Sequence, residues 1–390
     1  MPPTDVGAAD ELEVLHHRGD AALDAAFAAH DALAAAESAP VYARGEWLRI
    51  WRAANPQWEP FAVEVRAAGG PRAVALLARR RRRGSTEVVL MGAGDCDVAS
   101  VPAADDAAAA VLAGAVAAEL TAIKGRWRAV FDQMPAGAAV ARALAATLTC
   151  ARVVDGDPVP FTELSGGREA SSYLSRRFRK ETRRRRRRLE EEHAVTVEFV
   201  SDPAAIAAAA AAITGLRRRR DHDLSRPSTL DTEAGSAFWH GVVDHFAASG
   251  RLELALLRAG GELAAYVISI VDARDDGSVA YRGWDGRIAT QFSRFAPGQI
   301  LDVAVFEHCL ARPDVSIVDY GRGDQQQKTH YANSAYETVA LHVWSSSWLR
   351  RYDAAVDAAV AALRDFKESH PGLERRWRTL KRTALRAGSR

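Results

Sequence analysis

The chain has 390 residues, about twice the usual length of a domain, so we expect two domains with a core large enough to need no disulfide or metal. Hydrophobic residues make up 48% and charged residues 26% of the chain, which excludes a wholly disordered protein. The formal net charge is only +2, so the charge of the whole chain predicts no polyanionic partner.

Cysteine spacing and hydropathy narrow the class further. The three cysteines form no Cys-x-x-Cys pair, which excludes a disulfide framework and argues against a zinc site, so no metal is expected. The first residues show no basic segment followed by an apolar one, and no stretch of about 18 uncharged apolar residues occurs. We therefore expect a cytoplasmic protein without a secretion signal or a transmembrane segment.

The first half of the chain begins with an alanine-rich segment. Residues 1–40 predict a loosely attached helical lead-in, and residues 41–165 predict a first α/β domain. Large apolar residues at Trp47, Leu48 and Trp51 favour a helix over 45–51 that packs on a sheet. The elements expected after it are strands over 61–65, 73–77 and 87–91, a helix over 104–123, a strand over 127–131, a helix over 137–148 and a strand over 151–154.

The second half, residues 166–345, repeats the core of that order, with three strands, a helix and a strand. The elements expected there are strands over 196–200, 252–257, 263–271, 278–284, 315–320 and 338–344, and helices over 203–220, 232–249 and 298–310. Residues 346–390 predict a tail of two amphipathic helices, broken at residues 370–372, of which the second is strongly basic. The pattern indicates a duplicated α/β unit with helical extensions at both ends.

Several motifs of the second half resemble those of the CelD-type, cellulose-biosynthesis-related GNAT acetyltransferases. The motifs are the basic helix at 178–183, the turn Phe295-Ala296-Pro297-Gly298, and Asp319-Tyr320-Gly321-Arg322-Gly323-Asp324 followed by Lys328. In the first half, Trp47-Leu48 and Met91-Gly92-Ala93-Gly94-Asp95 are similar to the same family. The resemblance covers residues 41–345. It departs from the family at Gln327, where a tyrosine usually precedes the lysine.

This resemblance implies a fold and a reaction. The strand and helix order of the second half is that of the GNAT acyltransferase fold, and a tandem pair of such units is what Fem-type proteins use. We therefore expect an α/β fold of two GNAT-like domains with mixed, twisted sheets, the second of which is catalytic. The implied donor substrate is acetyl-CoA or another acyl-CoA.

Acyl transfer from a thioester to an amine needs an anchor for the CoA pyrophosphate and hydrogen-bond donors for the developing oxyanion. A helix N-terminus can supply the anchor, and Pro297-Gly298 opens the helix at 298–310, although the pair can also simply begin a helix. The donors would be backbone N–H groups freed where strand 278–284 diverges from strand 315–320. The candidate cofactor-binding residues are Pro297, Gly298, Gln299, Trp284 and Arg322.

The reaction also needs a base, and Asp319 follows an apolar strand at the edge of the sheet where ligands collect. It can act as that base, orient the amine or cap the turn that follows it, and Asp324 shares this ambiguity. Lys328 can hold a phosphate or a carboxylate, or lie solvated on a helix. His330 is a candidate proton acceptor or a surface residue. Tyr281 completes the candidate catalytic set, with a position in ordinary core as its alternative.

An arginine run needs separate treatment, because ten basic residues lie within the 13 positions 176–188. Consecutive arginines cover the whole circumference of a helix, so some of them face a partner. They can bind the phosphates of a cofactor or substrate, form a solvated face with local salt bridges, or bind nucleic acid. The absence of alternating aromatic residues disfavours base stacking.

The leading hypothesis is an acyl-CoA-dependent N-acyltransferase, most simply an acetyltransferase acting on an amine of a sugar or small metabolite. One alternative is a Fem-like aminoacyl-tRNA-dependent transferase, in which the arginine run would hold the tRNA. Another is a non-catalytic accessory protein of polysaccharide biosynthesis. The partner expected is an amine acceptor, and nucleic acid is expected only under the tRNA alternative. The basic tail can dock on the body of the protein, on another subunit or on an anionic membrane surface, and the sequence favours none of the three.

Overall fold

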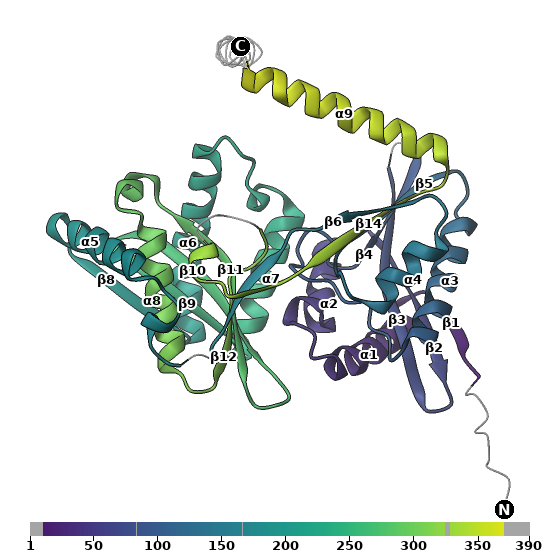
Figure 1. The fold of residues 1–390 in the computed structure, drawn as a ribbon, viewed down its shortest axis with the longest axis horizontal. Helices are drawn as coiled ribbons and strands as arrows, with labels where there is room; N and C mark the ends of the chain where they lie inside the picture. The colour runs from purple at the N-terminus through teal and green to yellow at the C-terminus, as the bar shows by residue number, and fades with distance from the viewer. Residues whose placement is uncertain (1–10, 83, 166, 324–327, 370–390) are drawn as a thin grey trace, which may run out of the picture.

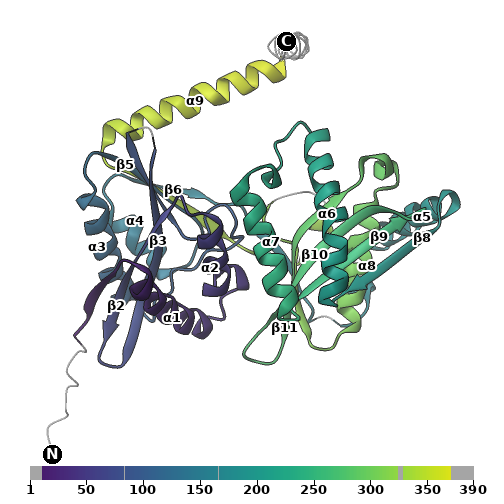
Figure 2. The same cartoon turned by 180° about the vertical axis from the view of Figure 1, so that it is seen from behind.

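The computed structural model describes residues 11–82, 84–165, 167–323 and 328–369. Two units lie side by side, each built on a seven-stranded mixed sheet with helices packed against it (Figure 1). This arrangement confirms the expected fold class of two α/β units with mixed sheets. Figure 2 shows the same pair of units from behind.

The first sheet has the strand order β1-β2-β3-β4-β5-β14-β6, in which only β4 and β5 run parallel. Its strands are β1 (Glu13–His17), β2 (Glu59–Ala67), β3 (Gly70–Arg82), β4 (Ser85–Leu90), β5 (Arg126–Pro135), β14 (Thr338–Trp344) and β6 (Ala151–Asp155). The helices packed on it are α1 (Asp20–Ala36), α2 (Gly45–Ala54), α3 (Asp106–Ala122) and α4 (Ala139–Thr147). Asp105 caps α3 by accepting the backbone N–H of Ala108.

The second sheet has the order β13-β7-β12-β11-β10-β9-β8, with β11 and β12 as its parallel pair. Its strands are β13 (Ser334–Tyr336), β7 (Val159–Glu163), β12 (Val315–Asp319), β11 (Val279–Ile288), β10 (Glu262–Ala273), β9 (Leu252–Ala259) and β8 (Val195–Val200). Helices α5 (Arg176–Glu192) and α8 (Pro297–Ala311) cover one face, and α6 (Pro203–Asp223) and α7 (Glu233–Ala248) cover the other (Figures 1 and 2). Strand β9 is almost wholly buried because helices cover both of its faces.

The two units share a hydrophobic core. One buried cluster runs from α1 and α2 of the first unit into α7 and the sheet of the second. At the contact, the ring of Trp47 on α2 lies 5.4 Å from the ring of Phe238 on α7. A second cluster lies under α3 and α4 on the outer face of the first sheet. The shared core fixes the units against each other.

Two strands lie in a different unit from the one predicted. Strand β7 falls before the expected boundary at residue 165, yet it pairs with β12 and β13 in the second sheet. Strand β14 was expected in the second domain, over 338–344, but it pairs with β5 and β6 in the first sheet. The predicted division between 41–165 and 166–345 is therefore wrong for these strands. Hydrophobic periodicity identifies a strand but does not reveal which sheet it joins.

The expectation of a loosely attached helical lead-in is also wrong for the described part of residues 1–40. Strand β1 pairs with β2 along the edge of the first sheet. Helix α1 follows it and buries Leu23, Ala26 and Phe27, each at most 1% exposed. The alanine-rich composition reflects close packing rather than weak attachment, because small side chains let a helix approach the sheet.

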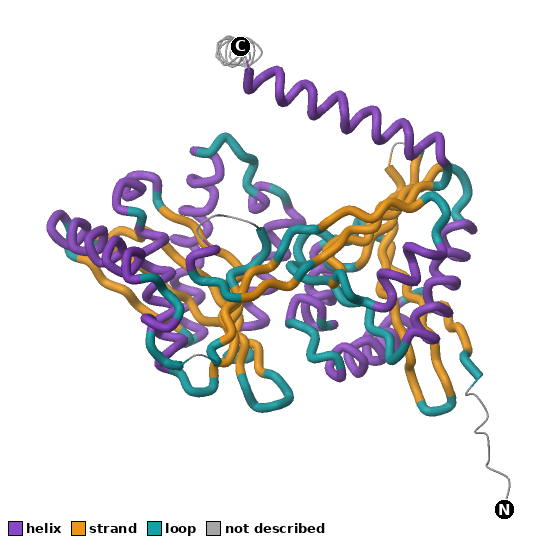
Figure 3. Tube along the Cα trace, viewed as in Figure 1, coloured by secondary structure: helices purple, strands orange, loops and turns teal. Residues whose placement is uncertain are grey.

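The first helix of the predicted tail is confirmed as α9 (Ser347–Ser369), which begins beyond β14 at the first unit and extends toward the side of the second unit without lying on it (Figure 3). The predicted break and the second tail helix lie outside the described residues. None of the helices in the described ranges is both long and apolar enough to cross a membrane.

Candidate functional site

The pairing of the parallel strands β11 and β12 ends partway along β11. It runs from Val279 opposite Val315 to Arg282 opposite Asp319, the last residue of β12, whereas β11 continues to Ile288. On the other side of β11, the register with β10 shifts so that Trp284 has no partner residue. In the described structure, β11 therefore has no strand partner on the β12 side beyond Arg282, which is the segment for which the divergence was predicted.

The extra residue at Trp284 also reverses which way the side chains of β11 point. Before it, the ring of Tyr281 lies 6.3 Å from the ring of His308 on α8. After it, Asp285 accepts hydrogen bonds from Trp239 on α7 and Arg217 on α6. The opening between the strands thus connects the two faces of the sheet.

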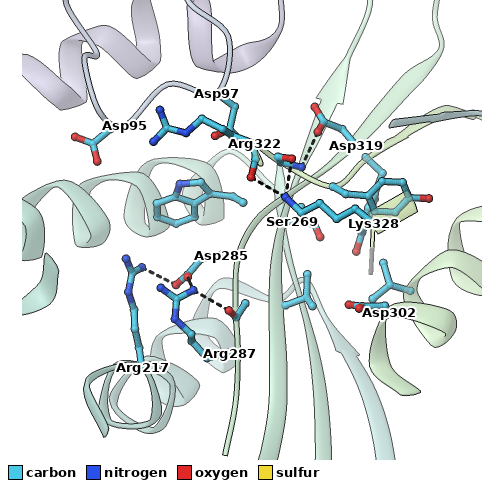
Figure 4. A pocket seen from close by; sticks show the side chains of 18 of the residues that line it. Asp95, Asp97, Arg217, Ser269, Asp285, Arg287, Asp302, Asp319, Arg322 and Lys328 are labelled. Carbon is cyan, nitrogen blue, oxygen red and sulfur yellow. Dashed lines mark hydrogen bonds and ion pairs between the residues drawn. The ribbon is translucent and has the colours of Figure 1, made fainter. Parts of the chain in front are cut away.

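A cavity of about 640 Å³ lies at this opening, between the two units (Figure 4). The first unit contributes the loop after β4, and the second contributes α6, α7, β10, β11, α8 and the loop after β12. The charged residues that line the cavity are Asp95, Asp97, Arg217, Asp285, Arg287, Asp302, Asp319, Arg322 and Lys328.

The loop after β4 carries two carboxylates into the cavity. Gly92 and Gly94 take left-handed backbone conformations, with φ of +88° and +86°, so the loop turns sharply. A Cβ atom on Gly92 would collide with the sulfur of Cys96, which itself packs against the body of the first unit. Glycine is therefore required for the turn that directs Asp95 and Asp97 into the cavity.

The pKa values of both carboxyl groups are raised toward neutral pH. Burial raises the pKa of Asp97 to about 6, with the nearby Asp319 carboxylate as a second cause, against the pull of Arg322. Burial within the concave walls also raises the pKa of Asp95 to about 6, although its side chain is open to solvent at the mouth. Such carboxylates are ionised at neutral pH and still accept a proton readily.

Asp319 lines the cavity, but the described contacts engage both of its oxygens. Arg282 donates from Nη1 to one oxygen at 2.8 Å, and the backbone N–H of Gly321 donates to the other at 2.8 Å. The turn-capping interpretation of Asp319 is thus the one that its contacts support. Asp324 lies outside the described residues.

The ion pair between Asp319 and Arg282 is part of a network of ion pairs that extends to the first unit. Arg282 also donates from Nε to Asp272 on β10 at 2.7 Å. Asp272 in turn lies 3.0 Å from Nη1 of Arg44 and accepts the backbone N–H of Val41. Because Arg282 is 3% exposed and Asp272 is fully buried, these contacts hold the end of β12 in register with the first unit.

Lys328 and Arg322 are confirmed as lining residues. The ammonium of Lys328 donates to the backbone carbonyls of Gly321 at 2.8 Å and Arg322 at 2.7 Å. Burial lowers the pKa of Lys328, while Asp97 raises it. Arg322 donates to the carbonyl of Gly94 in the first unit at 3.2 Å. These two cations therefore lie beside the carboxylates of Asp97 and Asp319. Gln327 lies outside the described residues.

Of the predicted aromatic residues, Trp284 and Tyr281 both line the cavity. Trp284 is half-buried among Trp47 and Trp239, with ring centroids 5.8 Å and 6.4 Å away. The Tyr281 hydroxyl is fully engaged beneath the cavity, because it donates to Glu253 at 2.6 Å. His330 does not line the cavity: it is exposed, and its ring lies 4.7 Å from the ring of Phe178 on α5.

The predicted phosphate anchor is not brought into the cavity. Pro297 does begin α8, but residues 297–299 are not among those that line the cavity. The Gln299 amide instead donates to Thr182 at 2.6 Å and accepts from Arg185 at 2.9 Å, which joins α8 to α5. The Pro-Gly pair correctly predicted where α8 begins, but it did not reveal that α5 packs against the start of α8.

Other lining residues were missed. Arg217 donates to Asp285 at 2.7 Å, and Arg287 approaches the same carboxylate at 3.3 Å. The Ser269 Oγ and the Tyr331 hydroxyl are buried without a hydrogen-bond partner in the described structure. Asp285 and Arg287 directly follow a predicted strand, which was the available signal, whereas nothing in the sequence marks Ser269.

The arginine run forms α5 and is partly neutralised locally. Arg184 and Arg185 pair with Glu181, and the next two arginines pair with Glu190 and Glu191. Exposed basic residues of α5 with no ion pair among the described residues are Arg176, Arg177, Lys180, Arg183 and Arg188. Local salt bridges therefore account for about half of the run.

Residues 176–331 match the family model described as the acetyltransferase (GNAT) domain. No curated protein sequence matches the chain. FemX has a similar fold, with a TM-score of 0.54 and 11% identity over 81% of this chain and 95% of that one. The C-terminal domain of a putative lysylphosphatidylglycerol synthetase from Agrobacterium fabrum is also similar, with a TM-score of 0.51 and 12% identity over 87% and 96% of the two chains.

A conserved protein of unknown function from Bacteroides thetaiotaomicron has a TM-score of 0.50 and 10% identity, over 85% of this chain and all of that one. Likenesses at this level of identity concern the fold alone. The family match covers the second unit's β8 to β12, where the opening between strands lies. Residues 176–331 thus match a GNAT acetyltransferase domain, and this match supports an acyltransferase enzyme.

Proposed function

We propose that the protein is an acyl-CoA-dependent N-acyltransferase, which transfers an acetyl group to an amine of a sugar or small metabolite. The observation that carries this proposal is the cavity at the divergence of β11 and β12, with the Asp97 carboxylate on the wall that the first unit supplies. The match to a GNAT acetyltransferase domain supports acyl transfer in general. The lining of the cavity is the basis on which we propose the acyl-CoA donor and the amine acceptor.

The part of the cavity beside α8 suits the thioester end of an acyl-CoA, which would bring an activated acyl group. Gly283 and Gly321 line the cavity, and their missing side chains let the two backbones lie close together, because a Cβ on Gly321 would be 3.0 Å from the carbonyl oxygen of Gly283. We assign the oxyanion donors to backbone N–H groups of β11 beyond Arg282, where the pairing with β12 has ended. Burial raises the pKa of Tyr331, so its hydroxyl, which has no hydrogen-bond partner in the described structure, stays protonated and can donate a hydrogen bond to the leaving thiolate.

The opposite wall suits the acceptor amine. Asp97 would take the ammonium proton, because its pKa of about 6 keeps it ionised at neutral pH while leaving it basic enough to act. Asp95, at the mouth, adds negative charge that attracts a cationic amine. Trp284 presents an aromatic face in the same cavity, of the kind that packs against a sugar ring. The CelD-like motifs favour an acceptor from polysaccharide biosynthesis.

The alternatives are less well supported. The tRNA-dependent alternative needs the arginine run as a binding surface, and four of its arginines are occupied by glutamates on the same helix. The accessory alternative rested on Gln327, but the lysine that follows it still reaches the cavity. The three functions can be distinguished by whether the cavity binds an acyl-CoA, an aminoacyl-tRNA or neither donor.

Calorimetric titration with acetyl-CoA is the direct test. We expect the intact chain to bind acetyl-CoA, and Ser269→Leu to weaken binding more than tenfold, because a larger side chain would fill the wall beside α8. Ser249→Leu, at the exposed residue that follows α7, is the matched control and should bind normally. No binding by the intact chain, together with salt-dependent tRNA binding, would refute the proposal in favour of the tRNA-dependent reaction.

A further inference from the structure

A stripe of large apolar side chains is exposed along α9. Its members recur every fourth residue, which places them on one side of the helix. Their exposed fractions are 58% for Trp348, 55% for Tyr352, 42% for Val356 and 52% for Val360. The other large hydrophobic residues exposed in the described structure, Val153 and Leu224, lie on separate elements.

The helix that carries this stripe has almost no support from the body. Its first turns are anchored, because Trp344 donates from Nε1 to Asp353 at 2.6 Å and the Arg126 guanidinium lies 5.4 Å from the centre of the Trp348 ring. Beyond that point, residues 354–362 are all exposed, and α9 stands clear of both units (Figures 1 to 3). Those nine residues carry a single charge, at Asp357. A helix of this composition gains its stability from packing, so it requires a partner.

The chemistry of the surrounding sequence identifies the partner. Residues 370–390, which follow α9, contain seven basic residues and one acidic residue. Trp348 and Tyr352 stack with centroids 5.6 Å apart, and side chains of these two types, with an apolar ring and a polar edge, favour the boundary between lipid and water. Basic residues beside an apolar helical face bind anionic lipid headgroups.

We propose that α9 docks the enzyme on an anionic phospholipid bilayer, with the stripe of Trp348, Tyr352, Val356 and Val360 in the interface. The sequence that follows α9 carries a net positive charge, which anionic headgroups attract. A second copy of the chain could cover the same stripe, but it would leave the positive charge of the tail unneutralised. No step of this inference depends on the proposed reaction.

Flotation of the intact chain with vesicles tests the proposal. We expect binding to vesicles of phosphatidylcholine and phosphatidylglycerol, weakening steeply as salt is added, and little binding to phosphatidylcholine alone. Replacing all four stripe residues with serine should reduce binding about tenfold or more. Reversing the charges at Arg375, Arg378 and Arg382 to glutamate should have a similar effect.

Val153→Ser with Leu224→Ser is the matched control, because it removes equally exposed apolar side chains elsewhere and should leave binding unchanged. The stripe variant should melt at the wild-type temperature, since its side chains lie outside the core. Equal binding by the stripe variant and wild type would overturn the proposal, as would the absence of binding to anionic vesicles. A dimer in sedimentation that the stripe substitutions dissociate, without lipid binding, would assign the stripe to a second copy instead.

Discussion

The substitution Asp97→Asn should change two measurable properties in opposite directions: it should raise the stability of the fold and lower the rate of acetyl transfer. Burial raises the pKa of Asp97 to about 6 from the ordinary value of 3.8. Because its pKa is higher in the folded chain than in the unfolded chain, the folded state loses stability as the pH rises from 3.8 to about 6, and the full loss persists above that range. About two pH units correspond to about 3 kcal/mol, which solvent contact with this half-buried group reduces to about 1–2 kcal/mol.

We therefore expect Asp97→Asn to raise the free energy of unfolding at pH 8 by about 1–2 kcal/mol, and by less at pH 5, where the wild-type carboxyl is largely protonated. The same change should lower the rate of acetyl transfer at least about 100-fold, since it removes the base. Urea unfolding at the two pH values and an amine-acetylation assay measure the two effects. Asp106→Asn, on the exposed start of α3, should alter neither.

A variant that is less stable than wild type at pH 8 would show that Arg322 and Lys328 stabilise the Asp97 carboxylate more than burial disfavours it. A variant with the full rate would assign proton removal to another group. Either result refutes the reasoning from which Asp97 is chosen as the base.

Two further substitutions test the parts around that base. Asp272→Ala leaves the buried Arg282 with one carboxylate, so it should lower the free energy of unfolding, measured in urea, by about 3–5 kcal/mol. Asp314→Ala removes an exposed ion pair and should lower the same free energy by less than about 1 kcal/mol. Equal losses in the two variants would contradict a supporting role for Asp272. Lys328→Met keeps the length of the side chain but removes its ammonium. The KM for acyl-CoA should therefore rise about tenfold or more, while the melting temperature is unchanged. An unaltered KM would exclude Lys328 from donor binding.

The fold could be predicted largely because each helix and strand has its own periodic pattern. The helices at 203–220 and 298–310 and the strands at 252–257 and 315–320 are present close to where the pattern placed them. Short strands such as β1, β7 and β13 were missed, since few residues carry their signal. Their sheet membership depends on contacts between residues far apart in the sequence, which local patterns do not encode.

The candidate site was predicted in part for the same reason. Lys328, Arg322 and Trp284 lie at strand ends or in the loop after β12, so topology alone brings them together. Asp97 enters the cavity from the other unit, and only the packing of α2 against α7 places it there. Pro297 and Gly298 do not line the cavity, and their role in cofactor binding stays a prediction. Gln299 beside them bonds to Thr182 of α5, and no local signal reveals which helix becomes a neighbour.

The exchange of β7 and β14 between the sheets has a consequence for any attempt to study either half alone. Strand β6 pairs only with β14, so a fragment ending near residue 165 would keep β6 with nothing to hold it to its own sheet. The same fragment would expose the edge of β5 and carry β7 as a dangling segment. Cleavage at one linker therefore cannot release two intact modules, and we expect the halves to regain structure only when both polypeptides are refolded as a mixture.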